Sequence, residues 1–506
     1  MSSHECRDFY QKLIVKLEER SRLEGVMGIM HWDQEVIMPS GATEARSKQM
    51  AALAGVVHEK SIDPEFGDLI NKINNFKIKG FTDVEQCNLN EAKRIFDLET
   101  KIPKVLVQEI AELSSRGHHI WAKARKENNF DDFVPTLERL IVLKQKWASY
   151  AFPDLDPYDA NIDVYERGMR MERITPIFEQ LKEKLIPLIK AIGDSRKEID
   201  TKFLEGNFSI DKQKKLGKII SNDIGFDFDK GRMDESVHPF CGGGHPTDVR
   251  ITTRYRSDNF IESLYGVIHE TGHGLYEQGR MSGFHDLPVS EPLTMAIHES
   301  QSLFWERMVA QNKMFCDRYI DKYSEIFPDN LNGVSSNKLY SAINSCHPSF
   351  IRVEADEVTY PMHIILRYEI EKGLFDGTIK VKNLPKVWND KMEEYLGIIP
   401  TSDSFGVLQD VHWSGGAFGY FPSYTLGAIY ACQFYEKMLR DFNDNSINII
   451  DGDLVCIKNW LNKNIHQLGR LYSPDDLAIK VTGEPLNPGI FINYLKNKYS
   501  EIYQLN

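Results

Sequence analysis

The chain has 506 residues, which is enough to bury a large hydrophobic core in one large unit or in a few smaller domains. Its hydrophobic share of 42% and charged share of 27% are ordinary for a globular protein. The formal net charge of -13 argues against a nucleic-acid partner, because binding to a phosphate backbone requires a concentrated basic surface.

The predicted elements, taken in chain order, are mostly helices. Apolar residues recur every three or four positions, which is typical of amphipathic helices, over residues 8–24, 105–127, 133–151, 177–186 and 358–372. Six prolines are expected at or near helix ends: Pro103, Pro135, Pro153, Pro157, Pro176 and Pro187. No repeat or Gly/Ser linker interrupts the pattern, so we expect one unit over residues 1–506. Its mostly helical part would be 1–225, and 226–506 would carry the metal site and the substrate-binding residues.

A short sheet is predicted near the middle of the chain. Residues 249–255 include Thr252, Thr253 and Tyr255, which favour a strand. The three glycines at 242–244 are interpreted as the turn that precedes it. We therefore expect a mainly α fold with a small β-sheet beside a helical cleft.

The same sequence argues against export and against a membrane span. Residues 1–20 contain charged side chains throughout, which leaves no room for the apolar core of a signal peptide. Seven scattered cysteines without CxxC spacing fit the reduced thiols of a cytoplasmic protein. One uncharged run, 413–435, is long enough to span a membrane, but its glycines and proline favour a buried loop that enters a core helix.

The chemistry of the chain is indicated by the pentapeptide at residues 269–273. His269 and His273 are four residues apart, so on a helix they project from one face and can bind the same metal ion. Glu270 beside them is a candidate general base that activates the water on a zinc ion. The alternative is a surface helix with incidental histidines. The apolar neighbours Leu264 and Leu275 oppose it, because they predict a partly buried helix in which unpaired histidines are costly.

A third metal ligand is expected from the next predicted helix, residues 293–309. Glu299 lies 26 residues after His273, and a turn around Gly279, Gly283 and Pro288 would fold that helix back. Metzincins carry a third histidine in the pattern HExxHxxGxxH. Here Gly279 occupies the position of that histidine, so a His-His-Glu site is preferred. On spacing alone, Glu299 is equally compatible with a solvated helix acid.

Several longer motifs resemble the M32 carboxypeptidases, the family typified by thermostable carboxypeptidases. The resemblance runs through most of the chain and includes His238-Pro239-Phe240, Asp248-Val249-Arg250-Ile251-Thr252, the pentapeptide, His298-Glu299-Ser300-Gln301, Ile351-Arg352-Val353-Glu354-Ala355-Asp356, the stretch 406–413, Phe418-Gly419-Tyr420-Phe421-Pro422 and, near the N-terminus, Trp32-Asp33-Gln34. It implies a helical peptidase with a deep groove, similar to the angiotensin-converting-enzyme and neurolysin group. It also implies a homodimer, one zinc ion per chain that cobalt can replace, and Glu299 as the third ligand.

The resemblance further implies release of single residues from peptide C-termini with broad specificity. Arginine suits a terminal carboxylate because its planar fork binds both oxygens. Arg352 is the first candidate and Arg250 the second, with salt bridges to Asp356 and Asp248 as the alternative interpretations. Trp32, Asp33 and Gln34 are expected to be structural.

Three other residues in these motifs are candidates. Tyr420 is predicted to donate to the oxyanion, or else to pack as an ordinary aromatic residue. His238 and His412 are predicted substrate contacts, or else core histidines. Two other functions stay open: an oligopeptidase that cuts internal bonds, and a metal-dependent peptide-binding protein without turnover. Glu270 argues against the second, because binding needs no general base.

Overall fold

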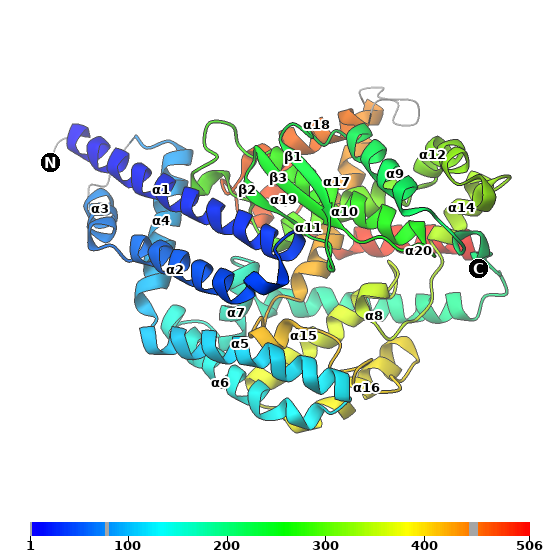
Figure 1. The fold of residues 1–506 in the computed structure, drawn as a ribbon, viewed down its shortest axis with the longest axis horizontal. Helices are drawn as coiled ribbons and strands as arrows, with labels where there is room; N and C mark the ends of the chain where they lie inside the picture. The colour runs from blue at the N-terminus through cyan, green and yellow to red at the C-terminus, as the bar shows by residue number, and fades with distance from the viewer. Residues whose placement is uncertain (1–2, 76–79, 445–453, 506) are drawn as a thin grey trace.

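A computed structural model describes residues 3–75, 80–444 and 454–505. Helices surround a small three-stranded sheet, which confirms the mainly α fold expected from the sequence (Figure 1). The helices that precede the sheet are α1 (Ser3–Val36), α2 (Thr43–Ser61), α3 (Pro64–Asn75), α4 (Asp83–Lys101), α5 (Lys104–Glu127), α6 (Val134–Ala151), α7 (Pro157–Tyr165), α8 (Met171–Gly193) and α9 (Ile210–Asp223). None of the described helices is both long and apolar enough to cross a membrane.

The sheet consists of β1 (Gly231–Glu235), β2 (Cys241–His245) and β3 (Asp248–Thr253) in the order β1-β3-β2. Strand β3 pairs in parallel with β1 and antiparallel with β2. The predicted strand is therefore confirmed, but the predicted glycine turn is wrong, because residues 242–244 lie inside β2. Gly244 allows α1 to pack directly on the strand, because a Cβ added there would lie 2.8 Å from the carbonyl oxygen of Gly25.

The predicted helices are confirmed, and most of the six prolines lie at or near helix ends. Pro176 and Pro187 are the exception, because α8 runs through both of them. An interior proline costs about 3 kcal/mol of helix stability. The helix persists because it buries a continuous apolar face that includes Phe178, Leu181 and Leu185.

The second half of the chain forms the helices around the sheet and the site. They are α10 (Phe260–Gln278), α11 (Met295–Leu303), the π-helix η5 (Phe304–Ala310), α12 (Lys313–Ile326), α13 (Pro328–Leu331), α14 (Ser336–Ile343), α15 (Tyr360–Asp376), α16 (Leu384–Leu396), α17 (Pro422–Asp444), α18 (Val455–Asn464), α19 (Pro474–Thr482) and α20 (Pro488–Tyr503). The uncharged run 413–435 consists of a loop and the first part of α17, as predicted, and the loop begins in the 3₁₀ turn η8 (His412–Gly415). Helix α15 is buried on nearly all sides, so its predicted amphipathic character is wrong and its Arg367 and Glu371 are fully buried.

Candidate active site

Two histidines of the pentapeptide project from α10, the helix that follows the sheet. Its N-terminus is capped by Asn259, whose side-chain oxygen accepts hydrogen bonds from the backbone of Ile261 at 2.9 Å and of Glu262 at 3.3 Å. Most of the helix is buried against β3, α9, α11 and η5. Polar side chains on this helix therefore need partners that replace water.

Helix α11 carries Glu299 and packs against both α10 and α17. Glycines set the distance from α11 to each of these two helices. A Cβ added at Gly272 would lie 2.6 Å from the carbonyl oxygen of Gln301, and one added at Gly427 would lie 2.9 Å from Cβ of Glu299. The glycine of the pentapeptide thus allows α10, with His269 and His273, to touch α11, with Glu299, through their backbones.

The structure brings His269, His273 and Glu299 together with one ligand atom from each within 4.8 Å of the others. Oε2 of Glu299 lies 3.3 Å from Nε2 of His273 and 3.6 Å from Nε2 of His269. Two imidazoles and one carboxylate are a donor set that suits catalytic zinc, which takes three protein ligands and keeps one open position. The residues present therefore fit the expected metal.

The charge balance of this group also suits a cation. Burial would raise the pKa of Glu299, but His269 and His273 outweigh it and lower the pKa to about 2. Burial would lower the pKa of His269, but Glu299 and Glu306 raise it to about 10. An ionised, partly buried carboxylate beside a histidine that attracts a proton is a place where positive charge is stabilised.

Both histidines are oriented by hydrogen bonds on their other ring nitrogen. Nδ1 of His269 lies 2.7 Å from Oε2 of Glu306, on the π-helix η5. Nδ1 of His273 lies 2.6 Å from Nδ1 of His298, whose Nε2 lies 2.9 Å from Oε1 of Glu277. Since carboxylates only accept, these contacts favour tautomers that leave Nε2 of each ligand histidine free for a metal. Glu306 and Glu277 were not identified from the sequence, although Glu277 lies four residues after His273 on the same helix.

Glu270 has the surroundings of a proton acceptor that works near neutral pH. Glu270 is 7% exposed, and its Oε2 has no hydrogen-bond partner among the described residues. Burial, with the acids Glu299 and Glu306 nearby, raises the pKa of Glu270 to about 7. A base is most effective when its pKa lies near the working pH.

Arg352 lies in the 3₁₀ turn η6 (Arg352–Glu354) and is 7% exposed. Its Nε donates to Oδ1 of Asp410 at 3.0 Å and its Nη1 to the hydroxyl of Tyr360 at 2.8 Å. The alternative salt bridge to Asp356 is therefore wrong: Asp356 instead accepts hydrogen bonds from the backbone, including that of Thr359. That alternative named an acid four residues away, whereas the actual partner of Arg352 is 58 residues away.

Asp410 is shared by two guanidinium groups. Its Oδ2 accepts a hydrogen bond from Nε of the fully buried Arg367 at 2.6 Å. Burial would raise the pKa of Asp410, but Arg367 and Arg352 lower it well below its usual range. Two positive charges on one negative charge leave this cluster with a net charge of about +1.

Tyr420 and His412 lie together beside this cluster. Their ring centroids are 5.3 Å apart, and Tyr424 connects them to Arg352, whose guanidinium carbon lies 4.9 Å from the Tyr424 ring centroid. Burial and the nearby Glu299 carboxylate raise the pKa of Tyr420 to about 12, so its phenol is a donor at neutral pH. Burial, with Arg352 nearby, lowers the pKa of His412 to about 4.

The remaining two candidates lie at the sheet. Arg250 makes a bidentate ion pair with Asp248, with both hydrogen bonds at 2.9 Å, and stacks on Trp32 with 4.3 Å from its guanidinium carbon to the ring centroid. The salt bridge named as the alternative for Arg250 is thus present. His238 is exposed in the loop between β1 and β2, so its alternative interpretation as a core histidine is wrong.

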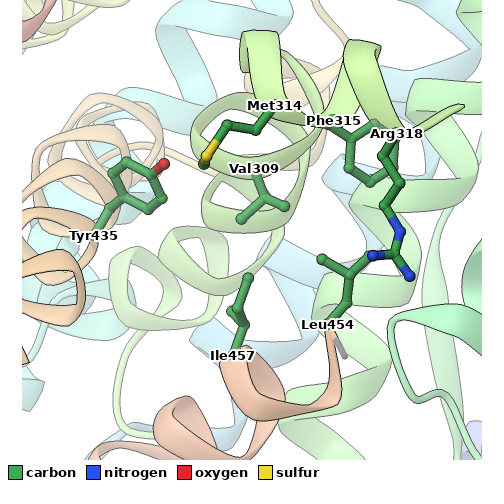
Figure 2. Close-up of a pocket in the computed structure, with 7 residues that line it drawn as sticks. All are labelled: Val309, Met314, Phe315, Arg318, Tyr435, Leu454 and Ile457. Atoms are coloured by element: carbon green, nitrogen blue, oxygen red, sulfur yellow. The ribbon is translucent and has the colours of Figure 1, made fainter. Parts of the chain in front are cut away.

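An apolar cavity lies between η5, α12, α17 and α18 (Figure 2). Its lining residues are Val309, Met314, Phe315, Arg318, Tyr435, Leu454 and Ile457. None of the residues discussed above lines it, and it offers no set of groups for catalysis.

The fold is mainly helical and surrounds a partly buried His-His-Glu group, a donor set that suits a catalytic metal. The chain belongs to the Carboxypeptidase Taq (M32) metallopeptidase family, whose sequence model matches residues 12–499. It is 39% identical over 500 residues to Carboxypeptidase 1 of Bacillus subtilis (strain 168), with 98% of this chain and 99% of that one covered.

Two further comparisons support this assignment. The chain is 36% identical to Thermostable carboxypeptidase 1 of Thermus thermophilus, over 98% of this chain and 99% of that one. The crystal structure of the M32 carboxypeptidase from Deinococcus radiodurans R1 matches with a TM-score of 0.95 and 33% identity, over 98% of this chain and 100% of that one. The chain is thus a metallocarboxypeptidase, a hydrolase of peptide bonds.

Proposed function

We propose that this chain is a zinc carboxypeptidase that removes single residues from free peptide C-termini with broad specificity, and that cobalt can replace zinc. The observation that carries the proposal is the convergence of His269, His273 and Glu299 beside Glu270, a buried carboxylate whose Oε2 lacks a partner among the described residues. His269, His273 and Glu299 would hold the metal. A bound zinc ion supplies a Lewis acid and lowers the pKa of water to roughly 7.

In this proposal, Glu270 accepts the proton of the attacking water and passes it to the leaving amine. Its raised pKa supports both transfers, because a group that titrates near 7 can gain and lose a proton at neutral pH. Tyr420 donates its phenolic hydrogen to the oxygen that becomes negative when the carbonyl is attacked. That role is supported by the pKa of about 12, which keeps the phenol protonated.

Arg352 is proposed to bind the terminal carboxylate of the peptide. Arg367 and Arg352 share one carboxylate, so Asp410 does not neutralise both of them. The hydrogen bonds of Arg352 use Nε and Nη1. A substrate carboxylate would add the second negative charge to a buried cluster that carries about one excess positive charge.

The family motifs support substrate contacts for His412, His238 and Arg250 as well. His412 lies beside Tyr420, whereas Arg250 would have to leave its ion pair with Asp248 to bind a substrate. We also propose one functional unit, 1–506, in which 1–225 supports the metal-site part 226–506. The largest hydrophobic cluster supports one unit, because it contains residues of both parts.

We also propose that the enzyme is a homodimer and that it acts in the cytoplasm. The dimer is inferred from the family resemblance. The cytoplasm is supported by the cysteines, none of which forms a disulfide, and all seven of them are among the described residues.

A mass-spectrometric time course tests the function directly. One peptide with a free C-terminus and the same peptide with a C-terminal amide are incubated with the enzyme before and after chelation. We expect stepwise loss of single residues from the free peptide only, abolished by the chelator and restored by zinc or cobalt. Cleavage of the amidated peptide at internal bonds would identify an oligopeptidase, and full activity without metal would contradict the zinc site.

A further inference from the structure

Glu371 is a buried acid that none of the roles above uses. It lies near the end of α15 and has 0% of its surface exposed. A carboxylate at such a position is costly unless hydrogen bonds replace the water that it has lost. Burial raises the pKa of Glu371 to about 7, and the hydrogen bonds around it act in the opposite direction. The hydrogen-bond donors around Glu371 therefore indicate which part of the structure it stabilises.

Three donors converge on the Glu371 carboxylate. The indole Nε1 of Trp413 donates to Oε1 at 2.7 Å. The backbone N–H of Gly419 donates to Oε2 at 2.8 Å, and the hydroxyl of Tyr158 on α7 donates to the same oxygen at 2.8 Å. Both carboxylate oxygens are thus engaged, and two of the three donors come from one segment of the chain.

That segment carries two of the proposed active-site residues. Trp413 directly follows His412, and Gly419 directly precedes Tyr420, so Glu371 holds the segment at both ends. Gly419 has φ +81° and is pressed against α7, because a Cβ added there would lie 2.6 Å from the backbone nitrogen of Ile162. A shift of the Glu371 carboxylate would therefore move Tyr420 with its neighbours.

We propose that Glu371 is a positioning residue of this enzyme: it fixes residues 412–420 so that Tyr420 and His412 meet the substrate in a productive arrangement. The inference rests on the proposed carboxypeptidase function and on the oxyanion role of Tyr420. Glu371 acts through Trp413 and Gly419, and it touches neither the metal ligands nor the peptide in this arrangement. Its loss is expected to affect turnover more than metal binding.

Glu371→Gln tests the inference with almost no change in shape. An amide presents a donor on one side, so at least one of the three donors then faces another donor. We expect kcat on the free peptide to fall about 10- to 100-fold, since a misplaced catalytic group costs rates of this order. Zinc content is expected to stay at that of the unaltered enzyme, because His269, His273 and Glu299 are untouched.

Glu369→Gln is the matched control on the same helix. Glu369 is a partly buried acid that pairs with Lys182 and Lys391, two residues from Glu371 in sequence. Its loss should lower the melting temperature but change kcat by less than about twofold, since its partners are lysines of α8 and α16 and not residues 412–420. Equal losses of kcat in the two variants would contradict the positioning role.

A double-mutant cycle separates positioning from general destabilisation. In a Tyr420→Phe background, Glu371→Gln should add less than about a threefold further loss, because the group that it positions has gone. Losses that multiply would overturn the inference. Trp413→Phe removes one donor and keeps the acid, so it should lower kcat about 3- to 10-fold. This variant decides the question if Glu371→Gln does not fold.

The outcomes also distinguish this inference from the proposed function. An unaltered enzyme that leaves free C-termini intact contradicts the proposed function. An active enzyme whose folded Glu371→Gln or Trp413→Phe variant keeps the full kcat contradicts the inference alone.

Discussion

Replacing Gly272 by alanine is predicted to damage the metal site without changing any ligand. Gly272 lies between His269 and His273 on the face of α10 that packs against α11, the helix of Glu299. A Cβ there would lie 2.6 Å from the carbonyl oxygen of Gln301 and 2.7 Å from Cα of Ser302. Both are backbone atoms, so they cannot rotate away as a side chain would.

The size of the effect follows from these distances. An ordinary contact requires roughly 3.4 Å or more, so the two helices must separate by about 0.7–0.8 Å at this point, at a typical cost of 1–3 kcal/mol for an overpacked core. Metal–ligand distances are held to within about 0.2 Å, so a shift between the histidines and Glu299 exceeds what the site tolerates. We expect zinc to bind on the order of 10- to 100-fold more weakly, comparable to the loss of an orienting contact.

Zinc competition with a chelator, followed by kcat at saturating zinc, measures the effect. Gly266→Ala is the matched control, because Gly266 lies on the same helix and an added Cβ would make only one ordinary contact, at 3.4 Å from Oγ1 of Thr253. The control should keep its zinc affinity and gain up to about 1 kcal/mol of stability from the better helix former. Wild-type zinc affinity in Gly272→Ala, or an equal loss in Gly266→Ala, would refute the reasoning.

Four further substitutions separate the proposed roles. Glu270→Gln should keep the metal and lose roughly 10²- to 10⁴-fold in rate, whereas Glu299→Ala should lose the metal; elemental analysis that shows the reverse would exchange the two roles. Tyr420→Phe should lower kcat by roughly 10²- to 10³-fold, and an unchanged kcat would mean that the residue only packs. Arg352→Ala and amidation of the peptide should each cost about 2–5 kcal/mol of transition-state stabilisation, which lowers kcat/KM roughly 30- to 5000-fold. Together they should cost little more than either alone, so losses that multiply would show that Arg352 does not bind the carboxylate.

The elements predicted from local patterns were mostly correct because those patterns are set within a few residues. The periodicity of residues 105–127 and 133–151 reproduces α5 and α6 almost to the residue. The errors arise where distant parts of the chain meet. Residues 242–244 lie in a strand that pairs with β3, and the packing of α1 against that strand is invisible in the local sequence.

In the candidate site, too, local spacing predicted some features, whereas contacts between distant parts of the chain were missed. His269 and His273 share a helix face, so their spacing alone predicts that they converge. Asp410 is 58 residues from Arg352, and Glu306 contacts His269 from a π-helix that no periodicity predicted. The residues that orient and balance the site are the ones that required the three-dimensional arrangement.

Three glutamates that are buried or partly buried in this structure illustrate why residue type alone does not give a role. Glu299 lies between two imidazoles that keep it ionised, which suits a ligand for a cation. Glu270 is raised to a pKa of about 7 with one oxygen unpartnered among the described residues, which suits transfer of a proton. Glu371 has a similarly raised pKa, but both of its oxygens are engaged by donors, so it is suited to holding a segment in place. Because the environment assigns the role, the same change to glutamine should give three different results: lost metal, lost proton transfer with metal retained, and a misplaced Tyr420.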